Sequence, residues 1–143
     1  MYKKYLFLVF VISISLSLLF CSNYHKEVKV KLGKQELYIH CVSKGFRTTY
    51  EFIVINNSAG EPDLDDTSST YLVLETDQIF YQSFADSLTI FYNYSNSKLK
   101  MKNLKGLVNL YALDFREYND ILENYKNYNK IKNINYFGVR EED

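Results

Sequence analysis

The sequence contains few of the residues that mark several specialised classes of protein. Its 143 residues include 1 Pro, 5 Gly, 2 Cys and no Trp. A single Pro with no Gly-X-Y period excludes collagen, and two Cys cannot form the disulfide framework of a small secreted domain. The 17 basic residues balance the 17 acidic residues, so no net charge attracts the chain to nucleic acid. The length allows one domain and is too short for a doubly wound nucleotide-binding enzyme.

Long apolar stretches are also scarce, apart from one near the N-terminus. Lys3 and Lys4 precede the uncharged residues 5–20, and this order of a positive and then an apolar region is typical of an export signal. As a helix, the apolar stretch spans about 24 Å, which is shorter than the ~30 Å hydrocarbon core of a bilayer. We therefore expect residues 1–20 to be a leader, with a permanent membrane anchor as the second interpretation.

The leader ends in Leu18-Leu19-Phe20-Cys21. This motif resembles the lipobox of bacterial lipoproteins, in which a Leu stands three residues before a Cys that becomes diacylated. The resemblance implies a lipid anchor such as palmitate on Cys21, a location in the cell envelope, and a membrane as one partner. Phe20 stands where that family has a small residue, so cleavage before Cys21 and retention of the leader both stay open. The polar residues after Cys21 lack the acidic run that resembles a surface-export tag, which favours a periplasm-facing location.

The second cysteine has two alternative fates, which depend on the first. If Cys21 carries lipid, Cys41 stays a lone thiol, and its place in a predicted strand indicates a small buried hydrophobic residue. If Cys21 is not modified, a Cys21–Cys41 disulfide would close a loop worth roughly 3 kcal/mol.

The rest of the chain has the pattern of one α+β domain. We expect a lipidation cysteine with a short tether over residues 21–26 and a single globular domain over 27–143. Alternating or β-branched runs predict six to eight short strands in a mainly antiparallel sheet, within 28–32, 36–43, 49–55, 71–75, 79–84, 87–94, 99–104 and 107–113. Apolar residues at spacings of three and four predict one C-terminal amphipathic helix over 115–128, packed on the sheet, and 134–139 is expected to form a final short strand.

No group of residues predicts an enzyme. The two histidines, His25 and His40, fall in the tether and in the middle of a predicted strand. His40 and Cys41 are neighbours on that strand and point to opposite faces, so they cannot act together as base and nucleophile. We expect His40 to be a partly buried strand residue and predict no catalytic residue.

An acidic connection is the best candidate for a metal site in the sequence. Glu61, Asp63, Asp65 and Asp66 supply the hard oxygen ligands that calcium prefers. The connection lacks the Gly and the bidentate Glu of an EF-hand loop, and acidic loops are commonly solvated turns. We therefore expect no cofactor, and a calcium ion bound by this connection is the alternative.

Charge and aromatic residues predict two further surfaces. Lys29 and Lys31 alternate with valines at the start of the domain, and with Lys26 and Lys34 they form a predicted basic face directed to the membrane. Tyr92 and Tyr94 share one strand face, and we interpret them as aromatics that face a partner.

These observations favour a small membrane-anchored envelope lipoprotein. Its domain is expected to be a non-catalytic binding or accessory module for a macromolecular partner, which we expect to be a protein of the envelope. The alternative function is an exported module that binds a cation or a small molecule through residues 61–66.

Overall fold

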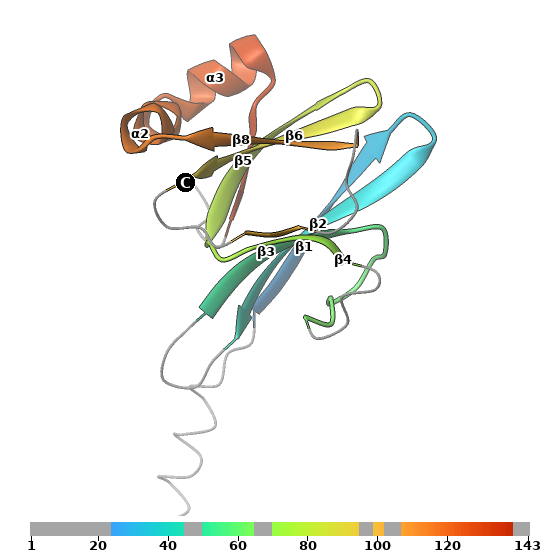
Figure 1. Ribbon diagram of the computed structural model, residues 1–143. Coiled ribbons are helices and arrows are strands. Elements are labelled where there is room, and N and C mark those ends of the chain that lie inside the picture. The colour runs from blue at the N-terminus through green and yellow to red at the C-terminus, as the bar shows by residue number, and fades with distance from the viewer. Residues whose placement is uncertain (1–23, 45–49, 65–69, 95–98, 102–106, 139–143) are drawn as a thin grey trace, which may run out of the picture.

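The fold consists of two stacked β-sheets with helices on the outer face of one of them. The computed structural model describes residues 24–44, 50–64, 70–94, 99–101 and 107–138 (Figure 1). In Figure 1 the first sheet, the second sheet and the helices lie one above another. Among the described residues, no helix has the length and apolarity needed to cross a membrane.

Sheet A contains five antiparallel strands in the order β1-β2-β3-β4-β7. Their bounds are β1 Tyr24–Leu32, β2 Gln35–Lys44, β3 Tyr50–Asn56, β4 Thr70–Leu74 and β7 Leu99–Met101. A two-residue turn joins β1 to β2, and Gly33 begins it at φ +58°, a backbone conformation that glycine adopts without strain. A side chain there would also collide with the Asp86 carboxylate, because an added Cβ would lie 2.1 Å from its Oδ1.

Sheet B contains four strands in the order β8-β6-β5-β9. Their bounds are β5 Gln78–Phe84, β6 Ser87–Asn93, β8 Val108–Leu113 and β9 Asn135–Gly138. Strand β8 runs parallel to β6, whereas the other pairs are antiparallel.

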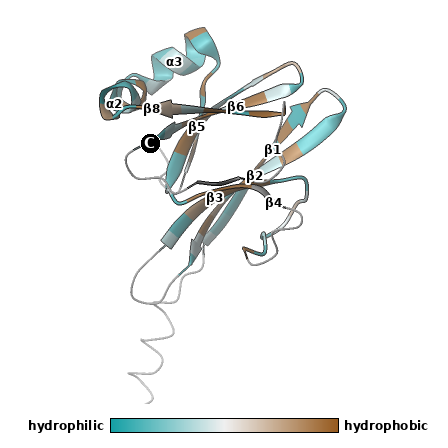
Figure 2. Ribbon diagram, in the orientation of Figure 1, coloured by the Kyte–Doolittle hydropathy of each residue, from teal (hydrophilic) through white to brown (hydrophobic). Residues whose placement is uncertain are grey.

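The main core lies between the two sheets. Alternate residues of each strand face it, such as Ile39 and Cys41 of β2 and Leu88 and Ile90 of β6, and all four are fully buried. Figure 2 shows hydrophobic residues on the strands between the layers and hydrophilic residues on the helices and on the hairpin ends.

A second, aromatic core attaches the helices to the outer face of sheet B. Helix α2, Phe115–Glu123, is followed directly by α3, Tyr125–Lys132, and the helical geometry breaks at Asn124. Phe80 of β5 is fully buried and contacts the rings of Tyr118, Tyr125 and Tyr136, with centroids 5.2–6.2 Å apart. Such pairs add about 0.5–1.5 kcal/mol each to the stabilisation by burial.

A fold that is mostly β, with mainly antiparallel strands and a helical region near the C-terminus, is confirmed, and the details differ in five ways. There are nine strands among the described residues, in two sheets rather than one, and one strand pair is parallel. The expected single helix is two, because the chain departs from helical dihedrals at Asn124. Strand β1 begins at Tyr24, so residues 24–26 belong to the sheet and not to a tether.

The first turn of α2 is capped by the side chain of Asp114, and this cap can be tested by mutation. Asp114 accepts hydrogen bonds from the backbone N–H groups of Arg116 and Glu117, both at 2.8 Å, and Glu117 accepts one from the Asp114 N–H at 3.2 Å. We expect Asp114→Ala to lower the free energy of unfolding by about 1 kcal/mol, because the first turn loses its acceptor. Chemical denaturation measures this, and Asp114→Ser, which keeps an acceptor, is the matched control. Equal losses in both variants would contradict the assigned cap.

Candidate functional site

The two histidines and one glutamate lie together on the outer face of sheet A. In the β1–β2 register Glu27 stands directly opposite His40, and His25 lies two residues before Glu27 on the same strand. Opposite residues of an antiparallel pair share a face, as do alternate residues of one strand. The hairpin therefore brings His25, Glu27 and His40 to one place, although His40 is far from the other two in sequence.

Three donor atoms of this cluster form a triangle of the size that a metal ion requires. His25 Nε2 lies 3.1 Å from His40 Nδ1, His40 Nδ1 lies 3.5 Å from Glu27 Oε2, and His25 Nε2 lies 4.0 Å from Glu27 Oε2. A point equidistant from the three atoms is about 2.1 Å from each, which matches zinc–nitrogen and zinc–carboxylate bonds. Among the described residues this is the group of His, Cys, Asp and Glu whose ligand atoms converge closely enough to hold an ion.

The hydrogen bonds of Asn56 determine which nitrogen of the His40 ring carries the proton. Asn56 Oδ1 accepts a hydrogen bond from the Ser58 backbone N–H at 3.1 Å, and a backbone N–H can only donate. The same oxygen lies 2.9 Å from His40 Nε2, so Nε2 carries the proton and donates to it. In neutral His40 the lone pair is then on Nδ1, the atom that faces His25 and Glu27.

A hydrogen bond joins the two histidine rings, between Nε2 of His25 and Nδ1 of His40. The ring centroids of His25 and His40 are 5.4 Å apart, and the angle between the ring planes is 21°. This centroid distance is near the largest that a nitrogen–nitrogen distance of 3.1 Å allows. The rings therefore meet edge to edge, and His25 Nε2–H donates to His40 Nδ1. A cation would replace this proton, and the His25 side chain is about a quarter exposed.

The connection after β3 covers the cluster. Its Gly60 N–H donates to Glu27 Oε2 at 2.9 Å, although Gly60 follows β3 and Glu27 lies on β1. Because β2 lies between those two strands, the connection must cross β2 on its outer face. His40 is completely buried on this face of the sheet, which is opposite to the main core.

Among the described residues, the converging ligand atoms come from His25, Glu27 and His40 and not from the acidic connection that was predicted as a calcium site. Glu61 and Asp63 are exposed, and Asp65 and Asp66 lie outside the described residues. The connection contributes to the cluster instead through the backbone N–H of Gly60, which holds the Glu27 carboxylate.

The four lysines of the predicted basic face do not share one face. Lys29 lies on the outer face, bonded to Glu36 at 2.7 Å, and that hydrogen bond raises the pKa of the Lys29 ammonium. Lys31 lies on the same face, two residues further along β1. Lys26 is on the opposite face, 5.9 Å from the centroid of the Phe137 ring, and Lys34 is in the β1–β2 turn.

The two tyrosines interpreted as facing a partner differ in environment. Tyr92 is half-buried and packs against the core between the sheets. Tyr94 follows the end of β6 and is 74% exposed.

The predicted lipidation residue, Cys21, lies outside the described residues, and Cys41 is a buried free thiol. The alternative disulfide involves Cys21 and therefore also lies outside the described residues. Burial, together with the acidic Glu51 and Asp77, raises the pKa of Cys41 to about 12. Cys41 faces the core and the adjacent His40 faces outward, so the two side chains lie on opposite faces of β2, as predicted.

Glu27 was not predicted as a candidate metal ligand, and His25 was predicted to lie in a tether. The predicted turn at Gly33 sets the register of the hairpin, and this register shows which residues lie opposite each other. A two-residue turn after Leu32 pairs Leu32 with Gln35, and counting outward from that pair places Glu27 opposite His40. The hairpin register thus identifies the cluster without further knowledge of the fold.

Comparisons of this chain with protein-family models, with curated proteins and with solved structures find no match. The functional argument therefore depends on the chemistry of the cluster itself.

Asn56 provides a test of the hydrogen-bond network around His40. We expect Asn56→Ala to lower the free energy of unfolding by about 1–3 kcal/mol, because the buried Nε2–H of His40 loses its acceptor. Nitrogen chemical shifts of the His40 ring should show the Nε2–H tautomer in the parent protein and a mixture in the variant. The exposed neighbour Asn57 supplies the control Asn57→Ala, and an equal loss there would contradict the assigned network.

Proposed function

We propose that this protein binds a divalent transition-metal ion through His25, Glu27 and His40 in the cell envelope. The observation that carries the proposal is the triangle of three donor atoms whose common centre lies about 2.1 Å from each. Two imidazoles and one carboxylate form a donor set that suits zinc and its neighbours in the first transition row.

The surroundings of the three ligands support the same function. Metal-bound histidines usually donate their second ring N–H to an oxygen acceptor, which orients the ring. His40 does so to Asn56, and the Glu27 carboxylate is held by the Gly60 N–H. Three protein ligands leave one coordination position for water or for a group from a partner.

The envelope location is supported by the leader and not by the domain. Residues 1–20 and Cys21 have the pattern of a lipoprotein leader, and the first metal ligand follows Cys21 by only four residues. The site would therefore be held close to the membrane surface, in a non-catalytic binding or accessory module. The converging donor atoms favour cation binding as the primary activity of this module, in place of the predicted recognition of a macromolecule.

Metal binding is tested by calorimetric titration of Zn²⁺ into protein purified without a polyhistidine tag. We expect binding of one ion per chain, and saturating zinc should raise the free energy of unfolding by about 2.7 kcal/mol when its free concentration is a hundred times Kd. Glu27→Gln and His25→Gln should each weaken binding by at least about tenfold, because loss even of an outer partner of a ligand has that effect.

The hairpin supplies a matched control for the glutamate substitution. Glu36→Gln removes the same charge from β2, at a residue bonded to Lys29 and not to the cluster. Both ligand substitutions are on the partly exposed rim of the site, so they should leave the fold intact. Stoichiometric binding that is unaffected by Glu27→Gln and His25→Gln would refute the site, as would the absence of binding to the parent.

The anchor is tested by the intact mass of protein from the membrane fraction of a bacterial host. We expect a mature chain that begins at Cys21 and carries acyl mass, and Cys21→Ser should abolish both. An unmodified full-length chain would instead indicate that Phe20 prevents processing and that the leader is the anchor. This result is independent of the metal titration.

A further inference from the structure

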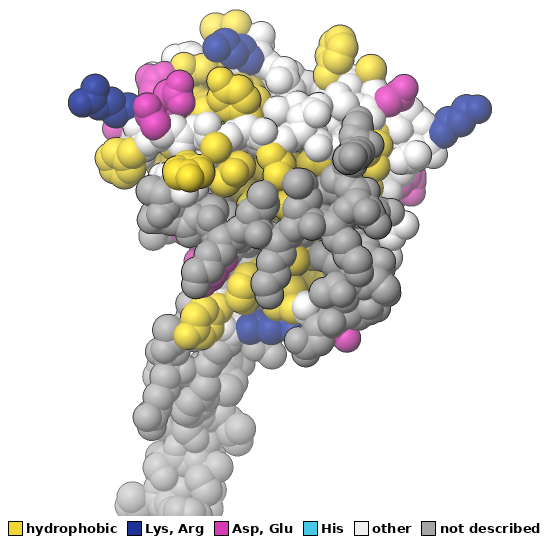
Figure 3. Space-filling model, viewed as in Figure 1, with side chains coloured by type: hydrophobic (Ala, Val, Ile, Leu, Met, Phe, Trp, Pro, Cys, Tyr) yellow, Lys and Arg dark blue, Asp and Glu magenta, His cyan; other side chains and the backbone are white. Residues whose placement is uncertain are grey.

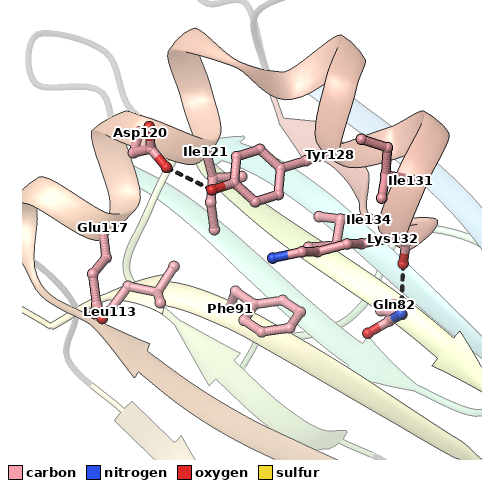
Figure 4. A pocket seen from close by; sticks show the side chains of 10 residues that line it. All are labelled: Gln82, Phe91, Leu113, Glu117, Asp120, Ile121, Tyr128, Ile131, Lys132 and Ile134. Carbon is pink, nitrogen blue, oxygen red and sulfur yellow. Dashed lines mark hydrogen bonds between the residues drawn. The ribbon is translucent and has the colours of Figure 1, made fainter.

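A second candidate binding site lies between the helices and sheet B, far from the metal ligands in the fold. It is a pocket of about 570 Å³, within the usual size range for sites that hold small molecules. Figure 4 shows ten lining side chains, which come from β5, β6, the end of β8, both helices and the residue before β9. They are Gln82, Phe91, Leu113, Glu117, Asp120, Ile121, Tyr128, Ile131, Lys132 and Ile134.

Apolar side chains form much of the pocket wall. Leu113, Ile121 and Ile134 are buried, and Phe91 packs against the same aromatic core. At the rim the large aliphatic side chain of Ile131 is 79% exposed. Figure 3 shows hydrophobic side chains at the surface of the layer that contains sheet B and the helices. An apolar ligand would cover part of this surface.

The two carboxylates of the pocket are already engaged by the protein. Asp120 accepts hydrogen bonds from the Tyr128 hydroxyl at 2.5 Å and from the Asn124 side chain at 2.9 Å. The bond to Asp120 raises the pKa of the Tyr128 hydroxyl, which therefore remains a donor. Glu117 accepts from the backbone N–H of Asp114 as part of the helix cap.

The ammonium of Lys132 is in a different situation. It lies 4.8 Å from the centroid of the Tyr128 ring and has no carboxylate within 4 Å in the described parts of the chain. In Figure 4 its side chain crosses the pocket between Tyr128 and Phe91. The backbone of Lys132 is fixed, because its carbonyl accepts a hydrogen bond from Gln82 Nε2 at 2.6 Å. Gln82 retains one amide N–H that can donate to a ligand.

We infer that this pocket binds a small organic monocarboxylate with an apolar body, such as an arylalkanoate. The apolar wall would bury the body, and Lys132 would pair with the carboxylate. Lys132 is the charged group of the lining that has no hydrogen-bond acceptor among the described residues, whereas both acids already accept hydrogen bonds from the protein. We therefore assign the ligand's carboxylate to Lys132. This ligand is independent of the proposed metal ion.

Three small molecules that share one apolar body and differ in their polar head group test this inference. The probes are 3-phenylpropionate, 3-phenylpropanol and 3-phenylpropylamine, and binding is followed by backbone amide chemical shifts of the protein as purified. We expect the shifts to concentrate at residues 82–91 and 113–134, with the carboxylate binding about tenfold more tightly than the alcohol. The amine should bind most weakly.

Two lysine variants separate recognition of the carboxylate from general charge effects. Lys132→Gln should reduce binding of the carboxylate to the level of the alcohol while leaving alcohol binding unchanged. Lys130→Gln removes the same charge from the same helix at a residue that does not line the pocket, and should preserve the preference. Unperturbed amide spectra away from the pocket would verify that both variants fold.

Three results would overturn the inference. One is the absence of shifts around the pocket with all three probes. Another is a preference for the alcohol or the amine, which would assign the pocket to a neutral or a cationic ligand. The third is a carboxylate preference that survives Lys132→Gln.

Discussion

The register of the β1–β2 hairpin is the constraint on which both the core and the proposed metal site depend. The two-residue turn at Gly33 fixes it, and a side chain at that position would have to displace the Asp86 carboxylate. A slip of one residue would turn the outward residues of a strand inward. On β2 it would move His40 into the core between the sheets and expose Cys41. The same turn therefore determines which residues are core and which are ligands.

Sheet A is unusual in burying polar residues on the face away from its main core. His40 and Asn56 are almost completely buried there, and each has a hydrogen-bond partner. Burial of such groups is tolerated only when their donors and acceptors are paired. The connection that covers them supplies the N–H groups of Ser58 and Gly60, so the cover and the cluster stabilise each other.

Much of the fold could be predicted from local patterns of hydropathy, whereas the candidate site required in addition the register of the β1–β2 hairpin. Alternation of Val30 with its lysine neighbours predicted which side of β1 is buried, and apolar residues at spacings of three and four predicted a helix that begins at residue 115, where α2 begins. The division of the strands into two sheets depends on long-range pairing, which periodicity does not report. His25 was assigned to a tether because β1 loses its clear alternation toward its start, where all of residues 24–26 are half-buried. The pocket beneath α3 is lined by residues from three strands and two helices. No local pattern of the sequence indicates that these residues lie together.

The position of β1 at the edge of sheet A has a mechanical consequence. The strand is paired only with β2 among the described strands, and its N-terminal end leads toward the leader. Tension applied at that end along the strand would load its hydrogen bonds in parallel, as in shear, and would not open them one after another. His25 and Glu27 lie at the loaded end of β1, and His40 lies on the strand that resists. An ion bound by all three would act as a cross-link at the point where the force enters the sheet.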